Sequence, residues 1–386
     1  MKDEAAVQGL SCPVYKKCGG CQLDVTYPQQ LGYKMRIVRE LLGKFGKVEP
    51  VVGMDDPMHY RCKVSSAFGY ARGRIITGVW QSNGGKLVQV ENCALEDERA
   101  KKIIDAIRIL LPVHKLRTYD EVSGQGFLRF VTVRIGKQTG EILVALGTGQ
   151  GKFPQLPAFA DALLQRCPEI TTLTRNVSTG RLNLLLGENE TVLHGAGYIT
   201  DILCGKRFRI SARSFFQVNP LQTERLYSLA VEAAGLTGQE TVIDAYCGVG
   251  TIGIIAADKA REVLSVEVNA DAVKNAGTNV TLNGLKNVRV FEGDAGEFMT
   301  AMAEDGRKAD VVFTDPPRAG CSREFLSSLL SLSPEKIVYI SCNPETQERD
   351  LKFLTKNGYK VKKIRPVDMF PYTRHIETVV SLTRKT

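Results

Sequence analysis

Residues 241–257, TVIDAYCGVGTIGIIAA, decide the fold of the second half of the chain. The stretch begins with an apolar run typical of a buried strand, turns at Gly248, Gly250 and Gly253, and continues as an apolar helix. The glycine spacing, G-x-G-x-x-G, lets the backbone approach a bound nucleotide because no side chain stands in the way. We therefore predict the first strand, glycine turn and helix of a nucleotide-binding α/β domain.

Strand-like runs follow this unit, with helical segments between most of them. Strands that alternate with helices imply a doubly wound, mainly parallel sheet. Because the pattern changes near residue 201, we predict a Rossmann-like α/β domain over 201–386 and a separate α+β domain over 1–200, the expected nucleic-acid-binding part. The strand-like runs are VLSVEVN (263–269), VRVFEGDA (288–295), DVVFTDPP (310–317), KIVYISCNP (336–344) and TVVSLTR (378–384), and a helix is predicted at 221–234.

The first 200 residues show shorter elements. Apolar residues at helical spacing, with basic residues between them, predict an amphipathic helix at 29–45. We expect this helix to pack on the α/β domain predicted at 201–386. Further helices are predicted at 95–111, before Pro112, and at 157–166. Strand-like runs lie between 51 and 90, in a hairpin at 127–147 joined by KQTG, and at 171–178, 181–187 and 190–195.

The charge of the chain is unevenly distributed. The formal net charge is +9, and residues 1–200 hold 26 lysines and arginines against 19 aspartates and glutamates. A basic half suits a polyanionic partner such as a nucleic acid, although a solvated basic surface explains the charge equally well. Arg129 and Arg134 in the predicted hairpin are candidate nucleic-acid contacts, with a solvated strand edge as the simpler interpretation.

No stretch resembles a targeting or membrane-spanning segment. The start, MKDEAAVQGL, lacks the basic and apolar regions of a signal peptide, and no apolar run has the length of a membrane helix. We therefore expect a cytoplasmic protein with no membrane partner. Ten cysteines in such a compartment argue against disulfides and for metal or catalytic roles.

Three early cysteines have a spacing that suggests a metal site. Cys12, Cys18 and Cys21 form C-x5-C-x2-C, and the two glycines of CGGC allow the tight turn that folds a loop around a metal. Cys93 is a fourth, distant ligand candidate, and four thiolates suit either a cubane iron–sulfur cluster or a zinc ion. The cysteines interpreted as structural are Cys62, Cys167 and Cys204.

Acidic residues at strand ends indicate which nucleotide the glycine turn binds. Glu267 ends the second predicted strand, where a carboxylate accepts hydrogen bonds from ribose hydroxyls. Asp294 ends the third strand, where it can bond an adenine, and Asp315 opens the DPP turn after the fourth. Because nothing suggests a hydride-acceptor pocket, S-adenosylmethionine fits better than a nicotinamide dinucleotide.

Cys342 stands in the stretch YISCNPETQERD, residues 339–350. It follows a buried strand-like run and precedes Asn343 and Pro344, which end a strand. Open α/β sheets bind ligands at the carboxyl ends of their strands, so Cys342 is a candidate nucleophile rather than a small core residue.

Taken together, the motifs resemble those of the RNA 5-methyluridine methyltransferases, which are class I S-adenosylmethionine-dependent enzymes. The resemblance covers nearly the whole chain, and the combination of the cysteine loop, DPPRAG and SCNP is highly specific. The motifs, in order, are CGGCQ, SFFQVNP, DAYCGVGTIG, DPPRAG, YISCNP and RHIETVV.

The resemblance implies several site residues. It implies a [4Fe–4S] cluster on Cys12, Cys18, Cys21 and Cys93. It also places cofactor contacts on Gln217, Tyr246, Glu267 and Asp315, beside Gly248 of the glycine turn and with Asp294 at a position that is often an amide. Such enzymes often begin with a small β-barrel TRAM domain, and because Cys12 is so near the amino terminus we expect none here.

The resemblance also implies a reaction. Cys342 would add to C6 of a uracil in RNA, C5 would take the methyl group, and Glu377 would remove the C5 proton. A stacked uracil is out of reach, so we expect it to be extruded, with Phe215 or Phe216 either stacking on a base or packing in the core. By analogy we expect large-subunit ribosomal RNA (23S) as substrate, with transfer RNA as the alternative, and a monomeric enzyme.

Three other functions explain part of the sequence. An exocyclic amino-methyltransferase of nucleic acid has a D-P-P loop, although Arg318 replaces the aromatic residue that such a loop carries. A nicotinamide-dependent oxidoreductase explains G-x-G-x-x-G alone. A non-catalytic RNA-binding or iron–sulfur sensor protein has no need for Cys342 and Glu377.

Overall fold

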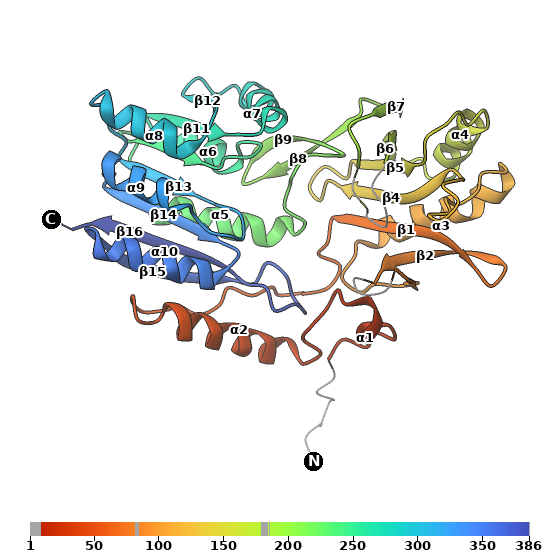
Figure 1. Ribbon diagram of the computed structural model, residues 1–386, viewed down its shortest axis with the longest axis horizontal. Coiled ribbons are helices and arrows are strands. Elements are labelled where there is room, and N and C mark those ends of the chain that lie inside the picture. The colour runs from red at the N-terminus through yellow and green to blue at the C-terminus, as the bar shows by residue number, and fades with distance from the viewer. Residues whose placement is uncertain (1–8, 82–84, 179–183, 185, 386) are drawn as a thin grey trace, which may run out of the picture.

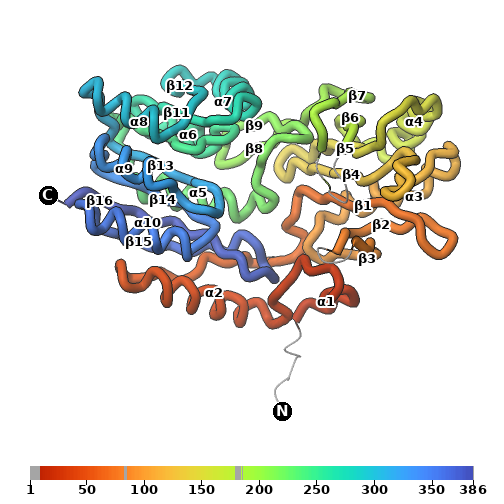
Figure 2. Tube along the Cα trace, in the orientation of Figure 1, coloured from red at the N-terminus to blue at the C-terminus, as the bar shows by residue number. Residues whose placement is uncertain are grey.

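The computed structural model describes residues 9–81, 85–178, 184 and 186–385. Two seven-stranded sheets stand beside each other, the first built by the first half of the chain and the second by the other half (Figure 1). A two-stranded ribbon of β8 (Tyr198–Leu203) and β9 (Lys206–Ser211) lies between them. The tube in Figure 2 shows the early segment, residues 27–42, beside the second half of the chain; the chain then builds the first sheet and afterwards the second.

The first sheet has the order β3-β2-β1-β4-β5-β6-β7 and is antiparallel except between β5 and β6. Helices α3 (Glu98–Val113) and α4 (Leu156–Arg166) share one hydrophobic core with its strands. The strands are β1 (Lys63–Ala71), β2 (Arg74–Trp80), β3 (Leu87–Gln89), β4 (Leu128–Ile135), β5 (Ile142–Thr148), β6 (Ile170–Val177) and β7 (Glu190–His194). Most of the strand predicted at 181–187 lies outside the described residues.

The two arginines of the predicted hairpin are neither RNA contacts nor a solvated edge. Arg129 is 5% exposed, where it binds the Glu121 carboxylate and donates to the Ser178 carbonyl at 2.6 Å. Arg134 is 4% exposed and donates to the Ala212 carbonyl at 3.3 Å. The expectation was wrong because every residue of β4 is buried, so the arginines bind protein groups.

The second sheet has the order β12-β11-β10-β13-β14-β16-β15. The strands from β10 to β14 are parallel to their neighbours, and β16 runs antiparallel between β14 and β15. The central strands are buried along their whole length, as expected for a sheet covered on both faces. Its strands are β10 (Thr241–Ala245), β11 (Glu262–Glu267), β12 (Val288–Glu292), β13 (Val311–Thr314), β14 (Lys336–Ser341), β15 (Tyr359–Val367) and β16 (Glu377–Arg384).

Helices cover both faces of this sheet. On one face α5 (Pro220–Ala234) and α6 (Thr251–Ala256) pack into one core, and α7 (Ala270–Leu282) lies against α6 and β9. On the other face lie α2, α8, α9 and α10, so the N-terminal helix α2 covers the second sheet and not the first (Figure 1). These helices span Tyr27–Leu42 (α2), Ala295–Glu304 (α8), Arg323–Leu332 (α9) and Pro344–Lys356 (α10).

Local sequence explains where α2 begins and how it packs. Thr26 and Gln29 form a reciprocal capping box, and Pro28 stands in the first turn. Its buried residues, Gln30, Lys34, Val38 and Leu42, are four apart and form one stripe. Two of the four are polar, which an ordinary core-facing stripe does not have.

The predicted elements agree with the observed ones to within a few residues. The largest differences are the strands β15, β8 and β9, which were not predicted. In addition, α3 runs past the expected stop and includes Pro112 in its last turn. In the described part of the chain, no helix has the length and apolar character needed to cross a membrane.

Candidate active site

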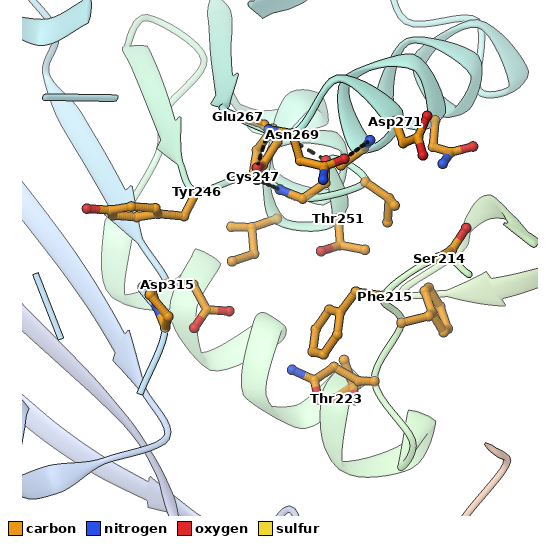
Figure 3. A pocket seen from close by; sticks show the side chains of 18 of the residues that line it. Ser214, Phe215, Thr223, Tyr246, Cys247, Thr251, Glu267, Asn269, Asp271 and Asp315 are labelled. Carbon is orange, nitrogen blue, oxygen red and sulfur yellow. Dashed lines mark hydrogen bonds between the residues drawn. The ribbon is translucent and has the colours of Figure 1, made fainter. Parts of the chain in front are cut away.

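A cleft of about 1170 Å³ opens where the parallel strands of the second sheet end. Most of the predicted site residues line it: Gln217, Tyr246, Gly248, Glu267, Asp315, Cys342 and Glu377. Figure 3 shows Glu267 and Asn269 on one side of the space, Phe215 on another, and Asp315 near the strand ends. The predicted cofactor contacts and the two predicted catalytic residues, Cys342 and Glu377, therefore share one cleft.

The glycine turn forms a cradle for a cofactor. Tyr246 has a left-handed backbone with φ of +60°, an uncommon conformation for a non-glycine residue and one that concentrates at functional sites. Gly248 has φ of +56°, and a β-carbon there would meet only open space within 4 Å. The backbone of the turn is therefore free to approach a ligand.

Glu267 is fixed by the backbone around the glycine turn. Its Oε2 accepts from Gly248 N at 3.0 Å and its Oε1 accepts from Asn269 N at 2.9 Å (Figure 3). Each carboxylate oxygen has a second lone pair for a ribose hydroxyl. Asn269 also lines the cleft and caps α7, a role that the sequence signals only through its position before a helix.

Gly253 and Asp244 fix the base of the same turn. Gly253 N donates to Asp244 Oδ2 at 2.8 Å, and a β-carbon on Gly253 would lie 2.7 Å from Ser265 Oγ. Burial raises the pKa of Asp244 to about 7, and the charges of Asp315 and Glu267 add to the rise. The third glycine is thus required for close packing of the helix on the sheet.

Asp294 has a different position from the other predicted cofactor contacts. Its Oδ1 accepts from Gly296 N at 2.8 Å and Glu297 N at 3.0 Å, so it caps α8. It is not among the described residues that line the cleft.

Strand pairing brings Cys342 and Glu377 together. Ser341 and Thr378 are partners in the antiparallel pairing of β14 with β16. Continuing this register by one residue places Cys342 opposite Glu377; both line the cleft, and the two are close enough for the charge of Glu377 to raise the pKa of the Cys342 thiol. Gln347 fixes this end by accepting from Thr378 Oγ1 at 2.5 Å and donating to the Tyr339 carbonyl at 3.1 Å.

Burial and neighbouring charges shift the pKa values of Glu377, Asp315 and Cys342. Burial raises the pKa of Glu377 to about 8, with a further rise from Asp315 and an opposing effect of Arg318. Burial alone raises the pKa of Asp315 to about 7. The pKa of the Cys342 thiol rises to about 11 because of burial and the charges of Glu377 and Asp315, whereas Arg318 lowers it.

Arg318 links the two most specific motifs. Its carbonyl accepts from Asn343 Nδ2 at 3.1 Å and Thr346 Oγ1 at 3.3 Å, so the DPPRAG turn is bonded to the turn after Cys342. Its guanidinium donates to His375 Nδ1 at 3.1 Å. Burial and then Arg318 lower the pKa of His375, so His375 accepts this bond as a neutral imidazole.

The two phenylalanines of SFFQVNP have opposite environments. Phe216 is 7% exposed and packs near Phe208, with ring centroids 6.0 Å apart. Phe215 is 74% exposed and lines the cleft, so it is the one available to stack on a base. Tyr227 and Phe370 also line the cleft; their positions on a helix and in an irregular stretch gave no sequence signal.

The predicted metal-binding cysteines lie outside this cleft. Burial raises the pKa of Cys21 to about 12, and Cys93, Cys18 and Cys12 each add to the rise, so the four thiols share one neighbourhood. Across the described residues, no group of three or more His, Cys, Asp or Glu side chains is arranged to hold a metal ion. Residues that pack around these thiols are Leu10, Met54, Tyr60, Leu95 and Tyr372.

The fold and the cleft define the class of the protein. Strand β16, the seventh strand of this sheet in chain order, lies antiparallel between β14 and β15, the fifth and sixth. In the dinucleotide-binding order the sixth strand lies directly beside the fifth, so this sheet differs from it. Together with the glycine turn and Glu267, this strand order indicates a Rossmann-like methyltransferase that uses S-adenosylmethionine.

Comparisons with known proteins give the family. The family model described as tRNA (Uracil-5-)-methyltransferase matches residues 196–385. A protein of Halalkalibacterium halodurans named as an RNA methyltransferase is 41% identical over 380 residues, which cover 97% of this chain and 83% of that protein. One from Listeria innocua is 39% identical over 379 residues, with 97% and 83% covered. The chain belongs to the uracil-5-methyltransferase family of RNA methyltransferases.

A solved structure agrees with this assignment. The crystal structure of Pyrococcus abyssi tRNA (uracil-54, C5)-methyltransferase in complex with S-adenosyl-L-homocysteine matches with a TM-score of 0.78 and 28% identity. The match covers 93% of this chain and 84% of that chain. The likeness therefore includes both sheets and not only the methyltransferase half.

Proposed function

We propose that this protein methylates carbon 5 of a uracil in RNA through a covalent adduct between Cys342 and C6 of the base. The observation that supports it most is that the register of β14 with β16, continued by one residue, places Cys342 opposite Glu377 in the cleft that also holds the glycine turn. An amino-methyltransferase needs no thiol opposite a carboxyl group. A nicotinamide enzyme would not share this strand order.

The chain has the groups to bind the methyl donor. S-adenosylmethionine, when bound, supplies an electrophilic methyl group. The open space at Gly248 and the two fixed oxygens of Glu267 match the cofactor's nucleoside part. Gln217, Tyr246 and Asp315 line the same cleft and are proposed as further contacts.

Cys342 acts first in the proposed mechanism. C5 of uracil is a weak nucleophile, so the thiol first gives its proton to solvent water. The thiolate Sγ then bonds to C6, and the C5–C6 π electron pair moves toward C4 to form an enolate with its charge on O4. Arg318 is positioned to favour the thiolate, since its charge opposes the rise in the pKa of Cys342. C5 then attacks the methyl group, and Asp315 is proposed to orient the uracil edge.

Glu377 completes the reaction. Its carboxylate takes the C5 proton, the C5–C6 double bond forms again, and Sγ leaves C6 as a thiolate. A base with a pKa near the working pH suits proton removal from carbon, and burial raises the pKa of Glu377 into that range.

We propose that the four clustered cysteines, Cys12, Cys18, Cys21 and Cys93, hold a [4Fe–4S] cluster. In such a cluster each of four iron atoms takes one thiolate, so the thiols gather without converging on one point. The shared neighbourhood of the four thiols fits this donor set. No step of the reaction is assigned to the cluster.

Two RNAs are candidate substrates. We propose large-subunit ribosomal RNA, by analogy, and transfer RNA is the second candidate. The second is favoured by the Pyrococcus abyssi relative, which is named as a tRNA enzyme, and by the description of the matching family model.

The test uses total RNA in which uridine is replaced by 5-fluorouridine. Fluorine cannot leave C5 as a proton, so the enzyme is expected to stall as a covalent protein–RNA adduct when S-adenosylmethionine is present. The adduct should be absent in Cys342→Ala, and sequencing of the trapped RNA identifies the substrate. If RNA and cofactor bind but no adduct forms, the covalent scheme is wrong.

A further inference from the structure

The segment between β15 and β16, residues 368–376, is anchored by side chains from distant parts of the chain. It leads directly into Glu377, and two of its residues, Phe370 and His375, line the cleft. Backbone groups at five consecutive residues, 368 to 372, bond to residues outside the segment. A connecting loop of ordinary mobility is not held in this way.

Helix α2 supplies the most buried of these anchors. Lys34 Nζ donates to Asp368 Oδ1 at 2.5 Å and to the Phe370 carbonyl at 3.0 Å, and both side chains of the ion pair are 0% exposed. One turn earlier, Gln30 Oε1 accepts from Tyr372 N at 2.7 Å, and Gln30 is also fully buried. These are the two polar residues of the buried stripe of α2.

The region of the clustered cysteines supplies further anchors. The Tyr372 carbonyl accepts from Gln22 N at 2.9 Å and Leu23 N at 3.1 Å, directly after Cys21. The Tyr60 hydroxyl donates to the Pro371 carbonyl at 3.1 Å. The cysteine-bearing loop and α2 therefore hold the same segment.

The start of α5 holds the segment from the cleft side. Asn219 Nδ2 donates to the Met369 carbonyl at 2.9 Å, and Gln222 Nε2 donates to the Asp368 carbonyl at 2.9 Å. Both side chains are fully buried and follow Gln217 in the chain. The segment is thus clamped between the cleft wall and α2.

A buried lysine–aspartate pair is a costly way to stabilise a fold, because both charges leave water. Apolar residues would serve packing alone at least as well. The pair does specify one position of Asp368 and the Phe370 carbonyl, and so it fixes where the strand that begins with Glu377 emerges.

We propose that Lys34 and Asp368 are positioning residues for Glu377, and that they set the geometry of the step in which the C5 proton is removed. The inference rests on the proposed uracil-C5 reaction and adds residues that do not touch substrate. Addition of Cys342 to C6 depends on β14 and is expected to proceed without the pair. Loss of the pair should therefore stall the enzyme after the adduct has formed.

The test compares two double variants: one removes the buried ion pair, and the other removes the Lys44–Glu348 pair together with the Lys352–Glu348 pair within α10. Lys34→Met/Asp368→Leu replaces the buried pair by apolar residues and leaves no lone buried charge. The matched control, Lys44→Met/Glu348→Leu, removes a more exposed pair that joins the end of α2 to α10. Each is assayed for kcat and KM, for the fraction of enzyme covalently bound to ordinary RNA during turnover, and for amide hydrogen exchange at 368–376.

For the buried-pair variant we expect kcat to fall at least 10-fold, KM for RNA to fall with it, and the covalent fraction to rise, because the slowed step follows formation of the adduct. Amides of 368–376 should exchange faster in this variant and not in the control. Wild-type kcat in the folded buried-pair variant, an equal loss in both variants, or unchanged exchange would each overturn the proposal. If the buried-pair variant does not fold, Tyr60→Phe removes one anchor and is expected to shift kcat and exchange in the same direction by a smaller factor.

Failure of the proposed function gives a different result. In that case the wild-type protein itself forms no 5-methyluridine, which is measured before any variant. A wild-type protein that methylates, together with a buried-pair variant that does so equally well, rejects only the positioning role.

Discussion

Cysteine occurs in two contrasting settings in this molecule. Cys342 directly follows a buried strand, lies opposite Glu377 when the register of β14 with β16 is continued by one residue, and lines the cleft. Cys12, Cys18, Cys21 and Cys93 come from loops and a single turn of helix, and they gather outside the cleft against a small core. The first thiol is placed by a sheet register, and the other four depend on how distant loops pack.

The contrast separates two kinds of function. A group at a strand end can reach a substrate with a geometry that the sheet fixes, which covalent catalysis requires. The loop that carries Cys21 bonds to Tyr372 through the next two residues, Gln22 and Leu23. The loop thiols are therefore placed to stabilise residues 368–376, which lead into Glu377, and not to touch substrate. The following changes test that division, beginning with the one expected to have the largest effect.

Replacing Cys342 by alanine should abolish methylation, because Cys342 is the nucleophile of the proposed scheme. Cys247 also lines the cleft, but it belongs to the glycine turn beside Glu267 and not to the strand end opposite Glu377. S-adenosylmethionine affinity and iron content should stay near wild type, since the cradle and the loop thiols are untouched. Methyl transfer to RNA, isothermal titration calorimetry and iron analysis measure the three quantities. Cys167→Ala, in the core of the first sheet, is the control and should methylate normally.

Glu377→Gln should lower turnover by about 10²- to 10⁴-fold, the range that a general base contributes. Cys342 remains able to add to C6, so a covalent protein–RNA band should build up on a denaturing gel with ordinary RNA. Fast turnover without such a band would assign the proton removal to another group, such as His375 or Asp315, which also line the cleft.

Several residues of the cleft could be predicted from sequence, because parallel strands that follow one another in the chain all end at the same edge of the sheet. Each strand ends at the same edge, so Glu267, Asp315 and Cys342 were expected to meet once the strands were recognised. Glu377 needed the resemblance to a family, since an antiparallel return of the last strand leaves no local signal. Tyr227 and Phe370 were missed because nothing in their neighbours distinguishes a cleft-lining aromatic from a core one.

Burial of charge was the other failure of sequence reasoning. Arg129 and Arg134 were expected to contact nucleic acid or solvent, and Lys34 was counted among the basic residues of an amphipathic face. All three are buried against partners that lie far away in the chain. A lysine or arginine is assigned to the surface by default, and only the tertiary structure supplies the groups that satisfy it.

Cys21→Ser should remove bound iron and lower methylation by about 10-fold, the lower end of what loss of supporting groups around a site costs. The expected cause is a shift of Tyr372 and the segment before Glu377, because Gln22 and Leu23 bind that segment directly after Cys21. Affinity for S-adenosylmethionine should not change. A complete loss of methylation with intact cofactor binding would contradict the division between the two cysteine settings.

The dependence of kcat/KM on pH should show the smallest of these effects. Burial raises the pKa of Glu377 to about 8 and that of Cys342 to about 11, so in the free enzyme the facing pair loses its first proton near pH 8. By these pKa values the first proton leaves Glu377, and the proposed scheme needs the Glu377 carboxylate to take the C5 proton, so the active form has lost this proton. The ionised fraction is about one tenth at pH 7 and one half at pH 8, so kcat/KM should rise about fivefold between them and level off above about pH 9. In Lys34→Met/Asp368→Leu the inflection should persist at a lower rate, because Glu377 stays buried. A profile that is flat from pH 6 to 9 would show that the pair is not what titrates, and the catalytic setting of Cys342 would then depend on Arg318 rather than on its strand partner.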